Sequence, residues 1–278
     1  MSSPDIDRYL AHIGLDRRPA ATLEGLTVLH RAHLRGVTYE NLDVQLGRKI
    51  DITVGPIFDK IVNRRRGGWC YEMNGLFGWA SKKLGFDVQR ATGAVMREAG
   101  GDAQTANHLV LRVALPEGIY LADVGFGDGP IAPIRVTEGP FTAGGFEFGL
   151  DRVDARWWRV RNHKFSGAKS FDFNLDPADE GAFAAKCIQL QTAPDSLFVQ
   201  NLICFRHREG AVDALVGRAH RVMTPAGIET RILDDAEDLV STLHNVFKLD
   251  VPEAGSLWPK ICARHDVVMA QAAAAAPS

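Results

Sequence analysis

The 278-residue sequence contains few cysteines, no large excess of either charge and no long hydrophobic run. Four scattered cysteines do not form a disulfide framework, so we expect a reducing, cytoplasmic compartment. A net charge of -2 gives no electrostatic reason to expect a nucleic acid or an anionic membrane as partner. No apolar run approaches the roughly 20 residues of a membrane span, and the N-terminus lacks the basic start and apolar core of a secretion signal. These absences are typical of a globular cytoplasmic protein.

Motifs for a resident cofactor are also missing. There is no glycine loop of the Walker type, and the glycine-rich segment at 144–149 lacks the spacing and the strand–turn–helix context of a dinucleotide site. Cys187, Cys204 and Cys262 have no C-x-x-C partner, so we expect no metal. The chemistry of this protein is therefore expected to come from its own side chains.

The pattern of apolar residues changes twice along the chain. Residues 1–85 have apolar residues at helix spacing, with Ser3-Pro4 as a plausible first cap, and this predicts a helical bundle. Residues 86–190 contain short β-like runs between turn residues, typical of an antiparallel barrel or sandwich, and end in a helix. Residues 191–278 mix strands and helices and finish in an alanine-rich tail, 270–278, that we expect to be frayed. The expected strands cover residues 88–96, 108–115, 119–126, 146–150, 157–160, 170–174, 197–206 and 218–223.

Gly67-Gly68-Trp69-Cys70 is the most informative stretch of the chain. Cys70 follows a two-glycine bend and precedes residues 71–80, which have the pattern of a helix that ends near Gly85. A thiol at a helix N-terminus lies where the macrodipole and free N–H groups favour the thiolate. The glycines lack a Cβ atom, so backbone or substrate can approach the sulfur closely. We therefore interpret Cys70 as a nucleophile that needs a proton acceptor.

Among the nine histidines, His108 has the clearest route to that role. It opens an apolar strand that is followed by Leu115-Pro116-Glu117-Gly118, the pattern of a tight turn. Folding the chain there pairs Leu115 with Gly118 and brings His108 and Asp123 onto one face as diagonal neighbours. A carboxylate inside an apolar strand is costly unless it is paired, and Asp123 on Nδ1–H of His108 would stabilise the imidazolium. The alternative is a solvent-facing Asp123 on a half-exposed strand.

Four segments together resemble the arylamine N-acetyltransferase family. Residues 66–74 (RGGWCYEMN) look like its nucleophile motif, and residues 39–44 (YENLDV) are similar to its upstream F-E-N-L signature. Residues 107–111 (NHLVL) look like its histidine strand and residues 123–127 (DVGFG) like its aspartate strand. The resemblance spans most of the chain, although it is loose in the C-terminal third. It implies that Cys70, His108 and Asp123 form a catalytic triad.

The resemblance also implies an α+β fold with a core like that of cysteine proteases. In it, a helical bundle (1–85) carries the nucleophile, an antiparallel β-barrel (86–190) carries His108 and Asp123, and an α/β lid (191–278) follows. The implied reaction is ping-pong transfer of an acetyl group from acetyl-CoA, as cosubstrate, to an arylamine, arylhydrazine or hydrazide. Coenzyme A and the small acceptor are the implied partners of a monomer or small homo-oligomer, with no bound prosthetic group.

Further site residues are expected around the triad. By the resemblance, Arg66 is structural and pairs with Glu40 and Asn41. Phe126 follows the aspartate strand and is a reasonable wall for an aromatic acceptor, with packing in the core as its alternative. Weaker expectations for substrate contact fall on Gly127, Tyr71, Val95 and Phe205.

Two other classes of function share these residues. A peptidase or transglutaminase-like amide transferase of the Cys-His-Asp type has the same residue order, and a non-catalytic binding module would retain the fold alone. The intact Cys70, His108 and Asp123 argue against the binding module.

Overall fold

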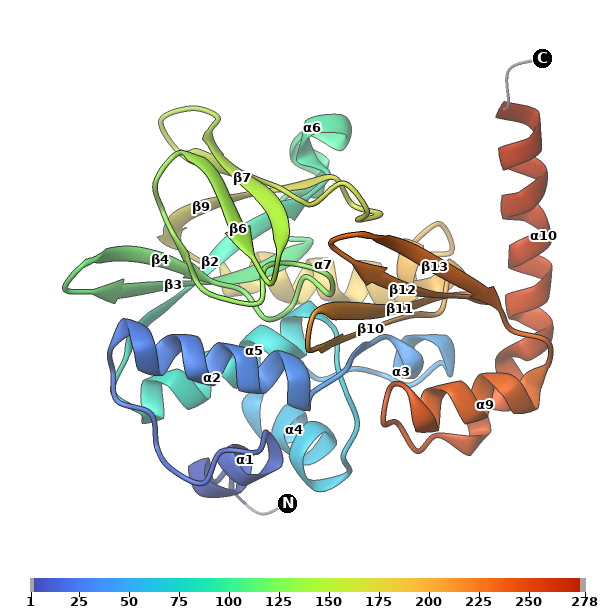
Figure 1. Cartoon of the computed structure of the whole chain (residues 1–278), viewed down its shortest axis with the longest axis horizontal. Helices are drawn as coiled ribbons and strands as arrows, with labels where there is room; N and C mark the ends of the chain where they lie inside the picture. The colour runs from blue at the N-terminus through green and yellow to red at the C-terminus, as the bar shows by residue number, and fades with distance from the viewer. Residues whose placement is uncertain (1–2, 276–278) are drawn as a thin grey trace.

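Helix α5 (Cys70–Lys83) lies among the N-terminal helices and is buried over most of its surface. It packs against strands β2 (Asp87–Val95) and β3 (His108–Leu115), so the segment that begins at Cys70 joins the helical part to the first sheet. The computed structural model describes residues 3–275 (Figure 1). Near α5 lie α1 (Ile6–His12), α2 (Leu23–Gly36), α4 (Val54–Phe58) and the π-helical turn η1 (Asp59–Asn63), whereas the short helix α3 (Leu42–Gln45) lies farther away, below β10 (Ile203–Arg208) in Figure 1.

The first helix begins later than the sequence suggested. Asp5, and not Ser3, is the N-cap of α1, because its carboxylate accepts a hydrogen bond from the Arg8 N–H over 2.9 Å. Thr22 caps α2 in the same way by accepting from the Gly25 N–H. On α2 the apolar residues Leu26 and Leu29 face the core, as their spacing predicted, and Leu34 faces it as well.

An antiparallel sheet of eight strands forms the middle of the fold, in the order β5-β4-β3-β2-β9-β8-β7-β6. It is curled rather than closed, since β5 and β6 are its edges in the part of the chain that the structure describes. Its concave core is aromatic and aliphatic and includes Phe171, Phe173 and Leu150. Its remaining strands are β4 (Gly118–Ala122), β5 (Ile134–Arg135), β6 (Gly139–Ala143), β7 (Phe146–Arg152), β8 (Trp157–Arg161) and β9 (Ser170–Pro177), and the short helices α6 (Arg97–Gly100) and η2 (Gly101–Gln104) follow β2.

The β3–β4 hairpin has the predicted register. Leu115 pairs with Gly118, and Val113 pairs with Tyr120. The second strand is shorter than the expected 119–126, because the ladder ends at Ala122. Asp123 stops it: its Oδ1 accepts a hydrogen bond from the Gly125 N–H over 2.8 Å, which turns the backbone away from the sheet.

A second antiparallel sheet ties the C-terminal part to the beginning of the chain. Its order is β1-β10-β11-β12-β13, and β1 (Tyr39–Glu40) comes from the helical part. The expected strand 197–206 is wrong in its first half, because the Ser196 hydroxyl caps a short helix there by accepting from the Phe198 N–H. The other elements are α7 (Glu180–Thr192), α8 (Leu197–Gln200), β10 (Ile203–Arg208), β11 (Ala211–Val216), β12 (Ala219–Thr224) and β13 (Gly227–Ile232).

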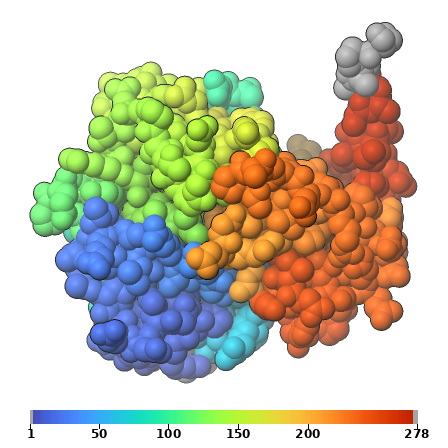
Figure 2. Space-filling model, viewed as in Figure 1, coloured from blue at the N-terminus to red at the C-terminus, as the bar shows by residue number. Residues whose placement is uncertain are grey.

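The chain ends in helices, and the last of them stands out from the body of the molecule (Figure 2). α9 (Ala236–Asn245) and the 3-10 helix η3 (Pro252–Leu257) precede α10 (Trp258–Ala275). The expected fraying from residue 270 is wrong as far as Ala275, since alanine has the highest helix propensity and continues α10. The rest of the expected tail, 276–278, lies outside the described residues. Within residues 3–275, no helix is both long and apolar enough to cross a membrane.

Candidate active site

Cys70 is the first residue of α5 and is 2% exposed. Trp69 is the N-cap, and its N–H donates to Oε2 of Glu72 over 3.2 Å, so a buried carboxylate holds the start of the helix. The Cys70 Sγ lies 3.8 Å from the carbonyl oxygen of Asn107, the residue before His108. The start of α5 therefore places the Cys70 sulfur beside the beginning of strand β3.

Two glycines permit this close packing. A Cβ atom on Gly67 would lie 2.0 Å from the Thr38 carbonyl oxygen, so the bend before the helix requires glycine. A Cβ atom on Gly125 would lie 2.8 Å from Cα of Cys70 and 2.6 Å from Nδ2 of Asn74. Glycine in the bend therefore lets two backbone segments come close together, and Gly125 does the same between the Asp123 segment and α5.

His108 and Asp123 form a buried pair, with Nε2 of His108 2.7 Å from Oδ2 of Asp123. The sequence predicted their proximity, but the expected atom is wrong: the carboxylate meets Nε2 and not Nδ1. The reason is that Asp123 lies beyond the end of β4 instead of on the sheet ladder. Phe171 and Phe126 pack edge-on against the imidazole, with ring centroids 5.3 and 5.6 Å from its own.

Asn74 connects α5 with Asp123 and with the backbone of the residue after His108, and sequence reasoning missed it. Its Nδ2 donates to Oδ1 of Asp123 over 2.7 Å and to the Leu109 carbonyl over 2.6 Å, while its Oδ1 accepts from the Val124 N–H. Its position four residues after Cys70, on the same face of a helix, was the available signal. His30 was also missed: its Nε2 lies 3.1 Å from the Asp123 carbonyl oxygen.

The surroundings of Cys70 raise the pKa of its thiol, whereas those of Asp123 lower the pKa of its carboxyl. Burial raises the pKa of the Cys70 thiol well above its ordinary value, and N–H groups of Leu109 and Tyr71 offset this only in part. Burial also raises the pKa of the Asp123 carboxyl, but His108, Asn74 and the Gly125 N–H together hold that pKa below its ordinary range. The thiolate expected at the helix start considered the macrodipole alone, and burial acts on the pKa of the thiol in the opposite direction.

A cavity of about 710 Å³ opens onto Cys70 and His108. That volume lies within the range of small-molecule sites. Among the expected substrate contacts, Phe126, Val95 and Phe205 line it. Tyr71 is fully buried, and its hydroxyl donates to the Ala106 carbonyl. The carbonyl oxygen of Gly127 lies 2.9 Å from Nε2 of His207. Neither of these two residues lines the cavity.

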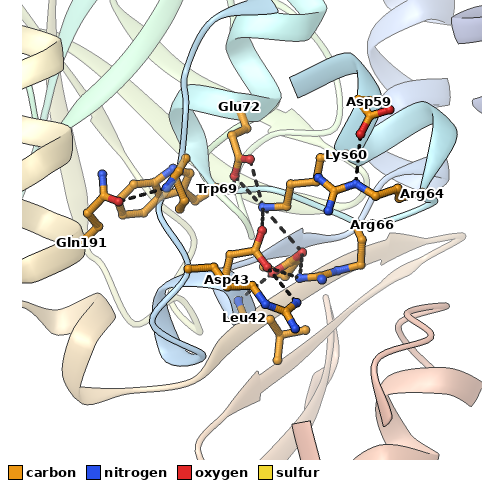
Figure 3. A network of polar contacts seen from close by, with 12 residues as sticks. Leu42, Asp43, Asp59, Lys60, Arg64, Arg66, Trp69, Glu72 and Gln191 are labelled. Atoms are coloured by element: carbon orange, nitrogen blue, oxygen red, sulfur yellow. Dashed lines mark hydrogen bonds and ion pairs between the residues drawn. The ribbon is translucent and has the colours of Figure 1, made fainter. Parts of the chain in front are cut away.

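Arg66 belongs to a buried ionic cluster beneath the start of α5 (Figure 3). Its guanidinium contacts Glu40 over 2.9 Å and Asp43 over 3.1 Å. The expected pairing with Asn41 is wrong, because the Asn41 amide donates to the carbonyls of Phe198 and Asn201 and its oxygen accepts from the Ile203 N–H. Asn41 thus ties the helical part to the second sheet.

Lys60 completes this ionic cluster. Its Nζ lies 2.9 Å from Oε1 of Glu72, 3.1 Å from Oδ2 of Asp43 and 3.9 Å from Oε1 of Glu40 (Figure 3). Through Glu72 it supports the N–H of Trp69, next to Cys70. The burial of Lys60 could not be predicted from the sequence, because a single lysine on an amphipathic segment is typical of a solvated helix face. In residues 3–275, no group of three or more His, Cys, Asp or Glu side chains is arranged to hold a metal ion.

The sequence is similar to known acetyl-transferring enzymes. A sequence model of the N-acetyltransferase family matches residues 22–255. The arylamine N-acetyltransferase of Mycolicibacterium smegmatis is 34% identical over 254 residues, which cover 89% of this chain and 92% of that protein. A pineal gland isozyme of arylamine N-acetyltransferase from Gallus gallus is 34% identical over 276 residues, covering 88% of this chain and 94% of the relative.

Solved structures show the same similarity. The arylamine N-acetyltransferase of Mycobacterium marinum, solved in complex with CoA, aligns with a TM-score of 0.84 at 31% identity, over 94% of this chain and 98% of that chain. The arylamine N-acetyltransferase of Salmonella typhimurium aligns with a TM-score of 0.84 at 25% identity, over 95% and 99%.

Proposed function

Because this chain belongs to the arylamine N-acetyltransferase family of acyltransferases, we propose that it carries an acetyl group from acetyl-CoA to an arylamine, arylhydrazine or hydrazide on Cys70. The observation that carries this proposal is the arrangement of Cys70 and His108 on one cavity, with Asp123 bound to the far side of the imidazole. A buried nucleophile, a base and a group that orients the base are what nucleophilic catalysis requires.

In the first half-reaction the Cys70 proton moves to Nδ1 of His108 as the sulfur attacks the thioester carbonyl. A bond forms between Sγ and the acetyl carbon, the bond from that carbon to the coenzyme sulfur breaks, and the coenzyme leaves as a thiol with the proton of His108. Backbone N–H groups at the start of α5 stabilise the oxyanion that develops.

In the second half-reaction the amine attacks acetyl-Cys70, His108 accepts a proton from the nitrogen, and Cys70 leaves with that proton as a thiol. Asp123, ionised and bound to Nε2, stabilises the imidazolium formed in both halves. A ring-conjugated amine suits this step because it is largely unprotonated at neutral pH. Phe126, Val95 and Phe205 supply an apolar wall for its ring.

Steady-state kinetics with acetyl-CoA and an arylamine test this proposal. We expect parallel double-reciprocal plots, because coenzyme A leaves before the amine binds. Asp123→Asn should reduce kcat by a factor of about 10³ to 10⁴, the loss typical of a misoriented catalytic imidazole. Intersecting plots would contradict the covalent route, and cleavage or cross-linking of peptides without acetyl transfer would favour the peptidase or transglutaminase-like alternative.

A further inference from the structure

The cavity has two cationic side chains at its solvent-facing edge, called the rim below, and Cys70 and His108 at its buried inner end, called the floor. Cys70 and His108, at the floor, are each 2% exposed. Lys186 of α7 and Arg221 of β12 line the same cavity but reach solvent, Lys186 in part and Arg221 freely. They come from two different elements, a helix and a strand of the second sheet, on the chain segment that follows the first sheet. The cavity that opens onto Cys70 therefore also presents two cationic side chains that reach solvent.

Neither cation is neutralised by a carboxylate. Lys186 Nζ donates to the Ala103 carbonyl over 3.0 Å and to Oε1 of Gln189 over 2.9 Å, which are both neutral oxygens. The side chain of Arg221 forms neither a hydrogen bond nor an ion pair within residues 3–275. On the neighbouring strand β13, by contrast, Arg231 is paired with Asp238 over less than 3 Å. The two cations at the rim are thus free to bind an anion.

We propose that Lys186 and Arg221 bind the phosphate groups of the acyl donor while its thioester reaches Cys70. The inference rests on the proposed function, since it assumes a coenzyme A thioester as donor. Such a donor has one uncharged acyl end and one end with several phosphate charges. The acyl end enters the buried floor, whereas the phosphates are too costly to desolvate and stay at the rim, where lysine and arginine donate charge-assisted hydrogen bonds.

Two carboxylates also line the cavity, those of Asp128 and Asp195. They differ in how strongly they would repel an anion bound at the rim. Asp128 is 3% exposed and bound by Nδ2 of Asn162 over 3.2 Å, so it belongs to the inner wall. Asp195 is exposed, and its carboxylate repels a phosphate bound beside it. The proposal therefore predicts that Asp195→Asn strengthens binding of the donor, whereas loss of Lys186 or Arg221 weakens it.

The experiment compares two acetyl donors, acetyl-CoA and p-nitrophenyl acetate, which has no phosphate. Lys186→Gln and Arg221→Gln should each raise the KM for acetyl-CoA by about two- to five-fold, the range of an exposed charge contact. Both should leave kcat and the KM for p-nitrophenyl acetate unchanged. Asp195→Asn should lower the KM for acetyl-CoA alone. Added salt should raise the wild-type KM for acetyl-CoA and have less effect on the double variant.

Lys83→Gln is the matched control, because Lys83 is an exposed cation of α5 that does not line the cavity. It should change neither KM. An unchanged KM for acetyl-CoA in the double variant, or equal increases for both donors, would overturn the assignment of the phosphate site. If the wild type instead fails to release p-nitrophenol in a Cys70-dependent reaction, the proposed nucleophile fails, and this result is distinct from a failure at the rim.

Discussion

The side-chain amide of Asn74 donates a hydrogen bond to Oδ1 of Asp123 over 2.7 Å. Asn74 lies one helical turn after Cys70, and its own oxygen accepts from the Val124 N–H. One side chain therefore joins α5 to the carboxylate that is hydrogen-bonded to His108. In the proposed mechanism, Asn74 is a positioning residue that keeps the three groups in register.

Asn74→Ala should slow acetyl transfer without abolishing binding of acetyl-CoA. It removes the Asn74 hydrogen bonds to Asp123 and to the Leu109 carbonyl. Among residues 3–275, the Asp123 carboxylate is then held only by the Gly125 N–H and His108, so the carboxylate and the imidazole can shift. We expect kcat to fall by about ten- to a hundred-fold, the effect of a displacement of about 1 Å at a reacting group, while KM for acetyl-CoA changes little. Asn245→Ala removes an exposed asparagine and should leave kcat unchanged. A large rise in KM at constant kcat would contradict the positioning role.

Gly125→Ala should inactivate the enzyme through a steric effect. The added methyl group would lie 2.8 Å from Cα of Cys70, so the nucleophile helix and the Asp123 segment must move apart. We expect a loss of kcat of at least about tenfold. In Gly55→Ala the methyl group meets no atom within 4 Å and lies in a helix, so activity should persist. Normal kinetics for Gly125→Ala would show that this close approach is unnecessary.

Lys60→Met tests the buried ionic cluster. Burial lowers the pKa of Lys60, but Glu72, Glu40 and Asp43 raise it more, so the side chain is a cation in the folded state. Its removal leaves three carboxylates with Arg66 as the remaining buried cation, and breaking a buried ion pair costs about 3–5 kcal/mol of unfolding free energy. Urea denaturation measures this loss. Arg18→Gln, which breaks an exposed pair with Asp7, should have little effect, and equal effects of both substitutions would argue against the role of the cluster.

Folding stability should fall on acidification from about pH 6.5 towards pH 4. Burial lowers the pKa of His30 and of His207 to about 4 and that of His33 to about 3. The unfolded chain binds protons on these rings near pH 6.5 and the folded chain does not, so stability is lost as the pH falls, by up to about 3 kcal/mol for each ring shifted to about 4. The free energy of unfolding, measured by urea denaturation at several pH values, should decrease over this range. A flat profile would contradict the neutral, buried histidines.

Asp128 should stabilise the folded protein on acidification from about pH 6.5 to pH 4, the opposite of the effect of the three histidines. Burial raises its pKa to about 6, so the folded state holds a proton that the unfolded state has already lost. Stability from this group is present at low pH and is lost as the pH rises through 6. Asp128→Asn removes that compensation and should make the decrease in stability between pH 6.5 and 4 steeper than in the wild type. An unchanged or shallower slope would show that Asp128 does not titrate in this range.

Local patterns predicted the elements that carry the site. The two-glycine bend and the apolar spacing after it indicated a helix that begins at Cys70, and the turn at Leu115–Gly118 set the register of β3 and β4, which the structure confirms. The α+β fold class is confirmed as well. The catalytic roles of Cys70, His108 and Asp123 and the division into three regions stay predictions.

Features that depend on tertiary packing were not accessible from the sequence. The meeting of Asp123 with Nε2 follows from a turn formed by its own side chain, which no periodicity records. The burial of Lys60 depends on three carboxylates from two separate segments, Glu40 and Asp43 in one and Glu72 in the other. Burial of the Cys70 thiol, which raises its pKa, is likewise set by the segments packed around the helix terminus. Each of these outcomes depends on which segments meet in the folded chain.

The intact mass of the protein after incubation with acetyl-CoA alone tests the central claim most directly. We expect one added acetyl group that maps to Cys70, that is absent from Cys70→Ala, and that disappears when an arylamine is added. Cys262→Ala, which removes a more accessible thiol, should still be acetylated. An unmodified wild-type protein, or an acetyl group that persists in Cys70→Ala, would contradict the account.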